Sequence, residues 1–186
     1  NIPVVALVGY TNAGKSTLLN KLTNADIYVA DQLFATLDPT TRQLELPSGE
    51  TVLLTDTVGF IQKLPTDLVA AFRATLEEIV EADLLIHLVD ASHKNAQSQR
   101  LTVLETLEEI GATDIPILTV YNKTDLLNPA EIEDLHKIAE PNAVFISALT
   151  GEGLSELAEA IAVGTYQTFV HVKVKLPYSE GRLVSL

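Results

Sequence analysis

Apolar and polar positions divide the chain into two kinds of segment that alternate along most of its length. Short apolar runs, which predict buried strands, cover residues 2–9, 41–46, 51–56, 83–90, 116–122 and 142–147. Segments with apolar residues at helical spacing cover residues 15–23, 66–82, 96–111, 129–140 and 153–164. Apolar strands that alternate with helices are typical of a parallel sheet covered on both faces. We therefore expect an α/β fold with a mostly parallel six-stranded sheet.

Two parts of the chain depart from this alternation. The second and third predicted strands are joined by the turn Pro47-Ser48-Gly49, so they predict a hairpin that supplies one antiparallel edge strand. From Thr168 onward apolar and polar residues alternate strictly, which predicts a half-exposed strand unlike the earlier ones. We expect one domain over residues 1–165 and the truncated start of a small C-terminal α+β element over residues 166–186. The chain is then an excerpt of a longer protein.

The composition limits the class of protein. The chain has 186 residues, of which 47% are hydrophobic and 20% charged, so it can form a packed core. No apolar run reaches the roughly 18 residues that a transmembrane helix needs. The absence of cysteine excludes disulfides and thiolate metal sites and fits a cytoplasmic setting.

The charge bears on possible partners. The formal net charge is −13, so we expect no general affinity for free nucleic acid or for anionic membranes, and we interpret the acidity as a source of solubility. An RNA-rich partner would have to be contacted through a local basic surface or through parts of the protein outside this chain.

The segment GYTNAGKST, residues 9–17, fits the phosphate-binding pattern G-x-x-x-x-G-K-[ST], and it follows a predicted strand and opens a predicted helix. Glycine at positions 9 and 14 lets backbone N–H groups approach phosphate oxygens at the helix N-terminus. Lys15 would reach the β and γ phosphates, and Ser16 would ligate Mg²⁺. The alternative is a plain glycine turn before a helix. The residues expected to contact the phosphates are Gly9, Tyr10, Thr11, Asn12, Ala13, Gly14, Lys15, Ser16 and Thr17.

Two later segments indicate that the base is guanine. In NKTD, residues 122–125, Asp125 would accept hydrogen bonds from the ring N–H and the exocyclic amine, a donor pair that adenine lacks. Asn122 would read the N7 edge and brace the phosphate loop, and the stem of Lys123 would lie against the base. The segment SAL follows another strand, and the backbone N–H of Ala148 would reach the guanine O6. Its residues Ser147, Ala148 and Leu149 are included in the expected site.

Two further segments are candidate switches. Asp56 ends a predicted strand where a carboxylate would help to hold Mg²⁺, and the backbone N–H of Gly59 would sense the γ-phosphate. Thr57 and Val58 lie between them. The segment FATLDPTTR, residues 34–42, holds three threonines, Thr36, Thr40 and Thr41, one of which would complete the Mg²⁺ shell. Spacing alone does not choose among the three.

In their order along the chain, GYTNAGKST, FATLDPTTR, DTVGF, NKTD and SAL resemble the HflX family of ribosome-associated GTPases, within the translation-factor class. The resemblance covers nearly the whole chain and implies a P-loop GTPase domain that binds GTP and GDP with Mg²⁺. It also implies association with the large (50S) ribosomal subunit, mainly through domains absent from this chain, and a role in splitting or rescuing ribosomes. It identifies Thr36 as the third metal-site residue beside Ser16 and Asp56. The first-switch residues implied to contact the nucleotide are Phe34, Ala35, Thr36, Leu37 and Asp38.

Position 60 raises a question about catalysis, because many GTPases place there a glutamine that orients the attacking water. Phe60 cannot accept a hydrogen bond from water, so we expect slow intrinsic hydrolysis. Either the ribosome or a K⁺ ion held by Asn12 would supply the missing function. The residues implied in catalysis are Lys15, Thr36, Gly59 and Asn12. The alternatives are a nucleotide-dependent binding module in which hydrolysis matters little, and an ATP-using P-loop enzyme, against which NKTD argues.

Overall fold

A computed structural model describes residues 1–23, 41–57 and 77–166 of the chain. These residues form one six-stranded sheet in the order β2-β3-β1-β4-β5-β6. The strands are β1 (Val4–Gly9), β2 (Thr41–Glu45), β3 (Thr51–Asp56), β4 (Leu84–Asp90), β5 (Ile117–Asn122) and β6 (Val144–Phe145). The helices are α1 (Lys15–Thr23), α3 (Ala96–Glu109), α4 (Pro129–Ile138) and α5 (Leu154–Tyr166), with a 3-10 turn at Thr124–Leu126. The predicted mostly parallel α/β sheet is confirmed.

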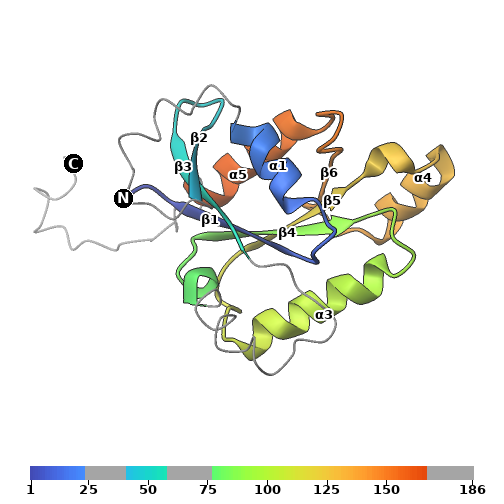
Figure 1. The fold of residues 1–186 in the computed structure, drawn as a ribbon, viewed down its shortest axis with the longest axis horizontal. Coiled ribbons are helices and arrows are strands. Elements are labelled where there is room, and N and C mark those ends of the chain that lie inside the picture. Colours follow the sequence, from blue (N-terminus) through green and yellow to red (C-terminus); the bar gives the residue numbers. More distant parts are fainter. Residues whose placement is uncertain (24–40, 58–76, 167–186) are drawn as a thin grey trace, which may run out of the picture.

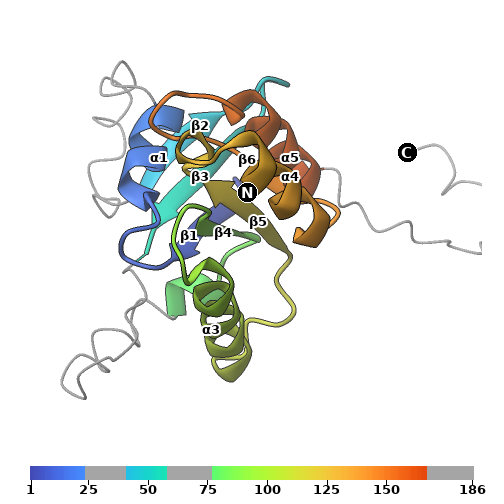
Figure 2. The same cartoon turned by 90° about the vertical axis from the view of Figure 1, so that its right-hand side faces the viewer.

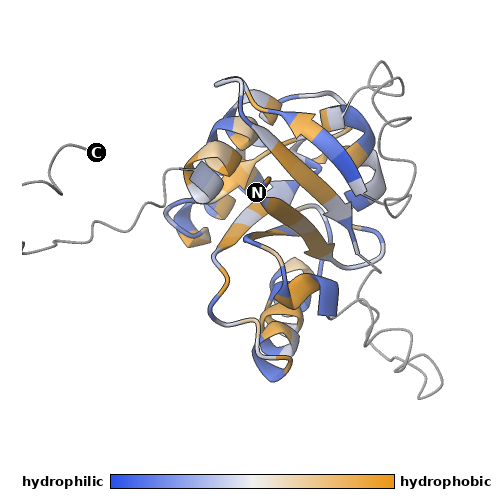
Figure 3. Ribbon diagram, turned by 90° about the vertical axis from the view of Figure 1, so that its left-hand side faces the viewer, coloured by the Kyte–Doolittle hydropathy of each residue, from blue (hydrophilic) through white to orange (hydrophobic). Residues whose placement is uncertain are grey.

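Helices cover both faces of the sheet, α1 and α5 on one side and α3 on the other (Figure 1). The alternation of side chains along β1 shows why its residues are apolar on both sides. Val5 and Leu7 pack in the cluster that contains residues of α1 and α5, whereas Ala6 and Val8 pack in the cluster that contains residues of α3. The view along the sheet in Figure 2 separates these layers, and Figure 3 shows the hydrophobic residues concentrated on the central strands.

The predicted hairpin is also confirmed. β2 pairs antiparallel with β3, whereas the other strand pairs of the described sheet are parallel. The turn between them is closed by a hydrogen bond of 2.7 Å from the Leu46 N–H to the Glu50 carbonyl. Gly49 takes a φ of 89° in this turn, a conformation that favours glycine.

Some predicted boundaries differ from those of the structure. β6 contains two residues, although the apolar run predicted a strand over residues 142–147. Within the described sheet β6 pairs with β5 alone. Beyond Phe145 the chain turns toward the loop after β5, where the Thr124 N–H and hydroxyl both bond the Ile146 carbonyl. Of the helix predicted over residues 66–82, residues 77–82 are described, and of these only residues 77–80 are helical. The second unit predicted over 166–186 lies outside the described residues except for Tyr166.

The end of α5 is fixed to the sheet, because the Tyr166 hydroxyl donates a hydrogen bond to the Thr51 carbonyl at the start of β3. Parallel β1, β3, β4 and β5 all end at the same edge of the sheet, where the loops of interest begin (Figure 1). Open α/β sheets bind ligands outside the carboxyl ends of their strands. Within the described ranges, no helix is long and apolar enough to cross a membrane.

Candidate nucleotide-binding site

The loop between β1 and α1 is closely packed at both of its glycines. A Cβ added at Gly9 would lie 2.4 Å from the carbonyl oxygen of Leu88 in β4. A Cβ at Gly14 would lie 2.6 Å from Nδ2 of Asn122, and Gly14 also has a φ of 95°. Both positions therefore require glycine for space, and Gly14 also for its backbone conformation.

Lys15 is the first residue of α1, and its side chain is buried inside this loop. Its Nζ donates to the carbonyl oxygens of Gly9 at 3.2 Å and Tyr10 at 3.0 Å. Burial lowers the pKa of Lys15, while the negative charge of Asp56 acts in the opposite direction without cancelling that effect. The loop thus holds a cation at the N-terminus of α1, where both the helix dipole and the ammonium attract phosphate.

Ser16 and Asp56 meet beside Lys15. The Ser16 hydroxyl donates to Oδ2 of Asp56 at 3.2 Å, and Asp56 closes β3. The other carboxylate oxygen, Oδ1, is buried and has no hydrogen-bond partner among the described residues. A hydroxyl, a carboxylate oxygen and a second oxygen without a partner are the hard donors that Mg²⁺ prefers, so these residues fit the expected ion. Next to them, the buried Thr57 hydroxyl donates to the Leu7 carbonyl at 2.5 Å, so its side chain binds the sheet.

The loop after β5 is bonded directly to the phosphate loop. Asn122 is 2% exposed; its Nδ2 donates to the Ala13 carbonyl at 2.8 Å, and its Oδ1 accepts from the Ala148 N–H at 2.9 Å. The predicted brace by Asn122 is therefore present. The Ala148 N–H that we expected to reach guanine O6 already has a partner, so a bond to the base would share it or replace it.

Lys123 has a left-handed backbone, with a φ of 64°, and its ammonium makes two bonds. Nζ lies 2.7 Å from the Asn12 carbonyl and 3.0 Å from Oδ2 of Asp90 at the end of β4. Burial alone raises the pKa of Asp90, but hydrogen bonds from Ser92 and the bond and charge of Lys123 outweigh it, so the pKa lies below its ordinary value. Sequence reasoning missed Asp90. Its signal is a carboxylate that ends a parallel strand, β4, next to the strand that ends in Asn122.

The carboxylate expected to read guanine is held in place by a neighbour. Oδ1 of Asp125 accepts a hydrogen bond of 2.8 Å from the fully buried Ser147 hydroxyl, which itself accepts from the Thr150 N–H at 3.1 Å. Leu149 is 71% exposed and offers an apolar side chain next to these residues in the sequence.

Several predicted site residues lie outside the described residues, namely Phe34, Ala35, Thr36, Leu37, Asp38, Val58, Gly59, and also Phe60 and Thr40. Of the three threonines left open by spacing, Thr41 lies in β2, and its hydroxyl is 3.0 Å from that of Thr55 in β3. Arg42, the next residue, lies opposite Leu54 in the same ladder. Among the predicted site segments that are described, the structure brings together the phosphate loop, Asp56, and the NKTD and SAL segments.

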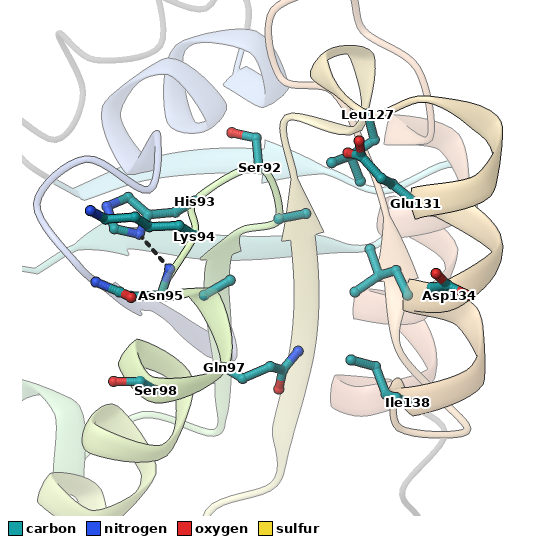
Figure 4. Close-up of a pocket in the computed structure, with 13 residues that line it drawn as sticks. Ser92, His93, Lys94, Asn95, Gln97, Ser98, Leu127, Glu131, Asp134 and Ile138 are labelled. Carbon is teal, nitrogen blue, oxygen red and sulfur yellow. Dashed lines mark hydrogen bonds between the residues drawn. The ribbon is translucent and has the colours of Figure 1, made fainter.

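A groove of about 630 Å³ lies nearby, between the start of α3 and α4 (Figure 4). Glu131, Asp134 and Ile138 face it from α4, and Ser92 to Ser98 face it from the opposite side. No residue of the phosphate loop or of the NKTD segment lines it. The groove is therefore distinct from the nucleotide site.

Comparison with known proteins agrees with this geometry. The family model described as "50S ribosome-binding GTPase" matches residues 4–123. A GTPase HflX of Alkalihalophilus pseudofirmus is 62% identical over 185 residues, which are 97% of this chain and 42% of that protein. The GTPase HflX of Escherichia coli is 50% identical over 187 residues, which cover all of this chain and 44% of that protein. The chain belongs to the HflX family of GTPases.

A solved structure supports the fold. A GTP-binding protein from the archaeon Sulfolobus solfataricus, in complex with GDP, is 30% identical with a TM-score of 0.70, and the match covers 89% of this chain and 53% of that one. The HflX-family chain thus has the fold of a P-loop GTPase domain. It spans less than half the length of the two curated relatives described above.

Proposed function

We propose that the chain is the GTP-binding and GTP-hydrolysing switch domain of a ribosome-associated HflX-type GTPase. The observation that carries this proposal is the direct bonding of two loops more than a hundred residues apart in sequence, through Asn122 to Ala13 and through Lys123 to Asn12. It joins the phosphate-binding groups and the guanine-reading group in one site. A nucleotide that spans both would be bound through its phosphates and selected through its base.

The described residues divide this work between them. Lys15 binds the β and γ phosphates, together with the N–H groups of residues 10–17. Asp125, oriented by Ser147, accepts from the two guanine donors and leaves ATP unrecognised. Asn122 keeps the two loops at a fixed separation. Phe34 to Asp38, Val58 and Gly59 would complete the contacts as switch residues.

Ser16, Asp56 and Thr36 would hold Mg²⁺. The ion would neutralise charge on the β and γ phosphates, which is its usual contribution in P-loop enzymes. The oxygen of Asp56 that has no partner in the described structure supports this role. The protein residues hold the phosphates in one position relative to the ion.

We propose that hydrolysis is slow in the isolated domain and is stimulated by the large ribosomal subunit, because Phe60 cannot orient water. The subunit would be bound mainly through parts of the protein outside this chain, in the cytoplasm, during splitting or rescue of ribosomes. Residues 1–165 form the GTPase domain in this proposal, and residues from 166 onward begin a second one. A K⁺ ion held by the Asn12 side chain is a second source of stimulation.

The test is multiple-turnover GTP hydrolysis in K⁺ and in Na⁺, each with and without large ribosomal subunits. We expect subunits to raise the rate, and we expect ATP not to displace bound GDP. Stimulation by K⁺ alone would point to Asn12. The variant Asn12→Ala should then abolish that stimulation. If neither raises the rate while GTP binds tightly, the domain is a nucleotide-dependent binding module instead. If guanine nucleotides do not bind at all, the whole proposal fails.

A further inference from the structure

The carboxylate of Asp90 lies between β4 and the NKTD loop and is assigned no part in nucleotide binding by the motifs described above. We propose that Asp90 is a positioning residue that prepares the nucleotide site by holding Lys123. This inference rests on the proposed binding of guanine nucleotides. It adds a residue that would contact neither the base nor the phosphates.

The two oxygens of Asp90 have different partners. Oδ1 accepts from the Ser92 N–H at 2.9 Å and from the Ser92 hydroxyl at 2.6 Å, which fixes the rotation of the carboxylate. Oδ2 is then directed to the Lys123 ammonium at 3.0 Å. The side chain of Asp90 is 11% exposed, so this ion pair is shielded from water on one side.

Lys123 gains from such a partner because the one other hydrogen bond described for its ammonium, to the Asn12 carbonyl, leaves a partly exposed side chain. Its backbone is left-handed, a conformation that disfavours lysine, and its side chain is 32% exposed. A long, flexible side chain in that setting would sample many rotamers. Held by Asp90, its ammonium donates to the Asn12 carbonyl at 2.7 Å and so ties the phosphate loop to the guanine loop.

The consequence is pre-organisation. Three elements, the end of β4, the NKTD loop and the phosphate loop, are joined in series through Asp90, Lys123 and Asn12. Without Asp90, a nucleotide must order Lys123 and the phosphate loop as it binds, and that ordering weakens affinity. Asp90 is not among the residues expected near the γ-phosphate, so the rate at saturating GTP should stay unchanged.

The test is a double-mutant cycle on GDP affinity with Asp90→Asn, Lys123→Met and the combined variant. Asp90→Asn keeps the size and the acceptor for Ser92 but removes the charge that faces Lys123. We expect Asp90→Asn to raise the Kd for GDP about tenfold, and to have less than about a twofold effect when Lys123 is already methionine. KM for GTP should rise with it while kcat stays the same. Asp134→Asn, which makes the same change of charge at an exposed carboxylate of α4 paired with Lys137, is the control and should leave Kd within about twofold.

Three outcomes would overturn the proposal: an Asp90→Asn Kd close to that of the original protein, an undiminished effect in the Lys123→Met background, or a loss confined to kcat. Failure of the original protein to bind GDP would instead defeat the proposed function. If Asp90→Asn does not fold, ¹⁵N NMR of the unsubstituted protein decides the matter. A Lys123 ammonium held by Asp90 should exchange its protons slowly, and fast exchange would contradict the ion pair.

Discussion

The side-chain amide of Asn122 donates a hydrogen bond of 2.8 Å to the backbone carbonyl of Ala13, 109 residues away in the sequence. The same side chain accepts from the Ala148 N–H, so one buried residue joins the phosphate loop, the end of β5 and the loop after β6. The geometry of the site therefore depends on a side chain as much as on the sheet.

Replacing Asn122 with alanine should damage both stability and binding. The change leaves the Ala13 carbonyl and the Ala148 N–H buried without partners, and we expect the free energy of unfolding to fall by about 2 to 3 kcal/mol. Affinity for GDP should fall by more than tenfold, because the two loops lose their fixed separation. Chemical denaturation and calorimetric titration would measure the two effects.

Asn128→Ala is the matched control for that experiment. Asn128 caps α4 by accepting from the Glu131 N–H at 2.9 Å, and in the described part of the chain its side chain bonds Glu131 and not the phosphate loop or the NKTD residues. Its loss should cost about 1 kcal/mol of stability and leave GDP binding unchanged. Equal losses of affinity in the two variants would show that general destabilisation explains the result.

Gly14→Ala and Gly49→Ala form a second matched pair. The two glycines have similar φ values, 95° and 89°, so the backbone strain of an added Cβ is similar. Only at Gly14 does the Cβ meet another group, Nδ2 of Asn122 at 2.6 Å, whereas nothing lies within 4 Å at Gly49. We expect Gly49→Ala to lose about 1 kcal/mol of stability, Gly14→Ala to lose more than that, and only Gly14→Ala to lose GDP binding. GDP titration of both proteins would check this, and retained binding in Gly14→Ala would show that the loop can move.

The sequence predicts the sheet, its antiparallel edge and most helices because apolar runs of strand length alternate with segments of helical period. Both patterns are set by which side chains of each element are buried. It also predicts Lys15, Asp56 and Asn122, which lie in motifs with fixed spacing. Asp90 was missed because its partner Lys123 lies 33 residues away, and no sequence pattern contains both residues. β6 was predicted too long because an apolar run does not record where a strand leaves its neighbour.

The proposed Mg²⁺ site at Ser16 and Asp56 gives a prediction that is tested by measuring affinity with and without the ion. Asp56→Asn removes the charge next to Ser16, so GTP affinity in Mg²⁺ should fall about tenfold, while affinity in EDTA should match that of the original protein. Glu50→Gln removes an exposed carboxylate bonded to Ser48 in the β2–β3 turn and should change neither value. An Asp56→Asn protein with the original dependence on Mg²⁺ would contradict the assignment of this site.

His87 should make the fold sensitive to acid. It is 1% exposed in the middle of β4; burial and, secondarily, the charge of Arg100 lower its pKa to about 3. Its Nδ1 has no hydrogen-bond partner in the described structure, and the small cavity beside it, lined also by Tyr10, Asp90 and Arg100, has a volume of about 10 Å³. That volume has room for about one water molecule and not for a hydrated anion that would stabilise a charged ring.

The sign of the effect follows from which state binds the proton. Between pH 6.5 and about 3 the unfolded chain protonates this histidine and the folded protein does not, so stability present above pH 6.5 is lost as the pH falls. From pH 7.5 to 5.5 the loss from this one group is about 1.4 kcal/mol. His87→Gln, which does not titrate, should lose less stability over that interval by the same amount in urea unfolding measured at both pH values. Parallel losses in the two proteins would mean that the fold does not lower the pKa of His87.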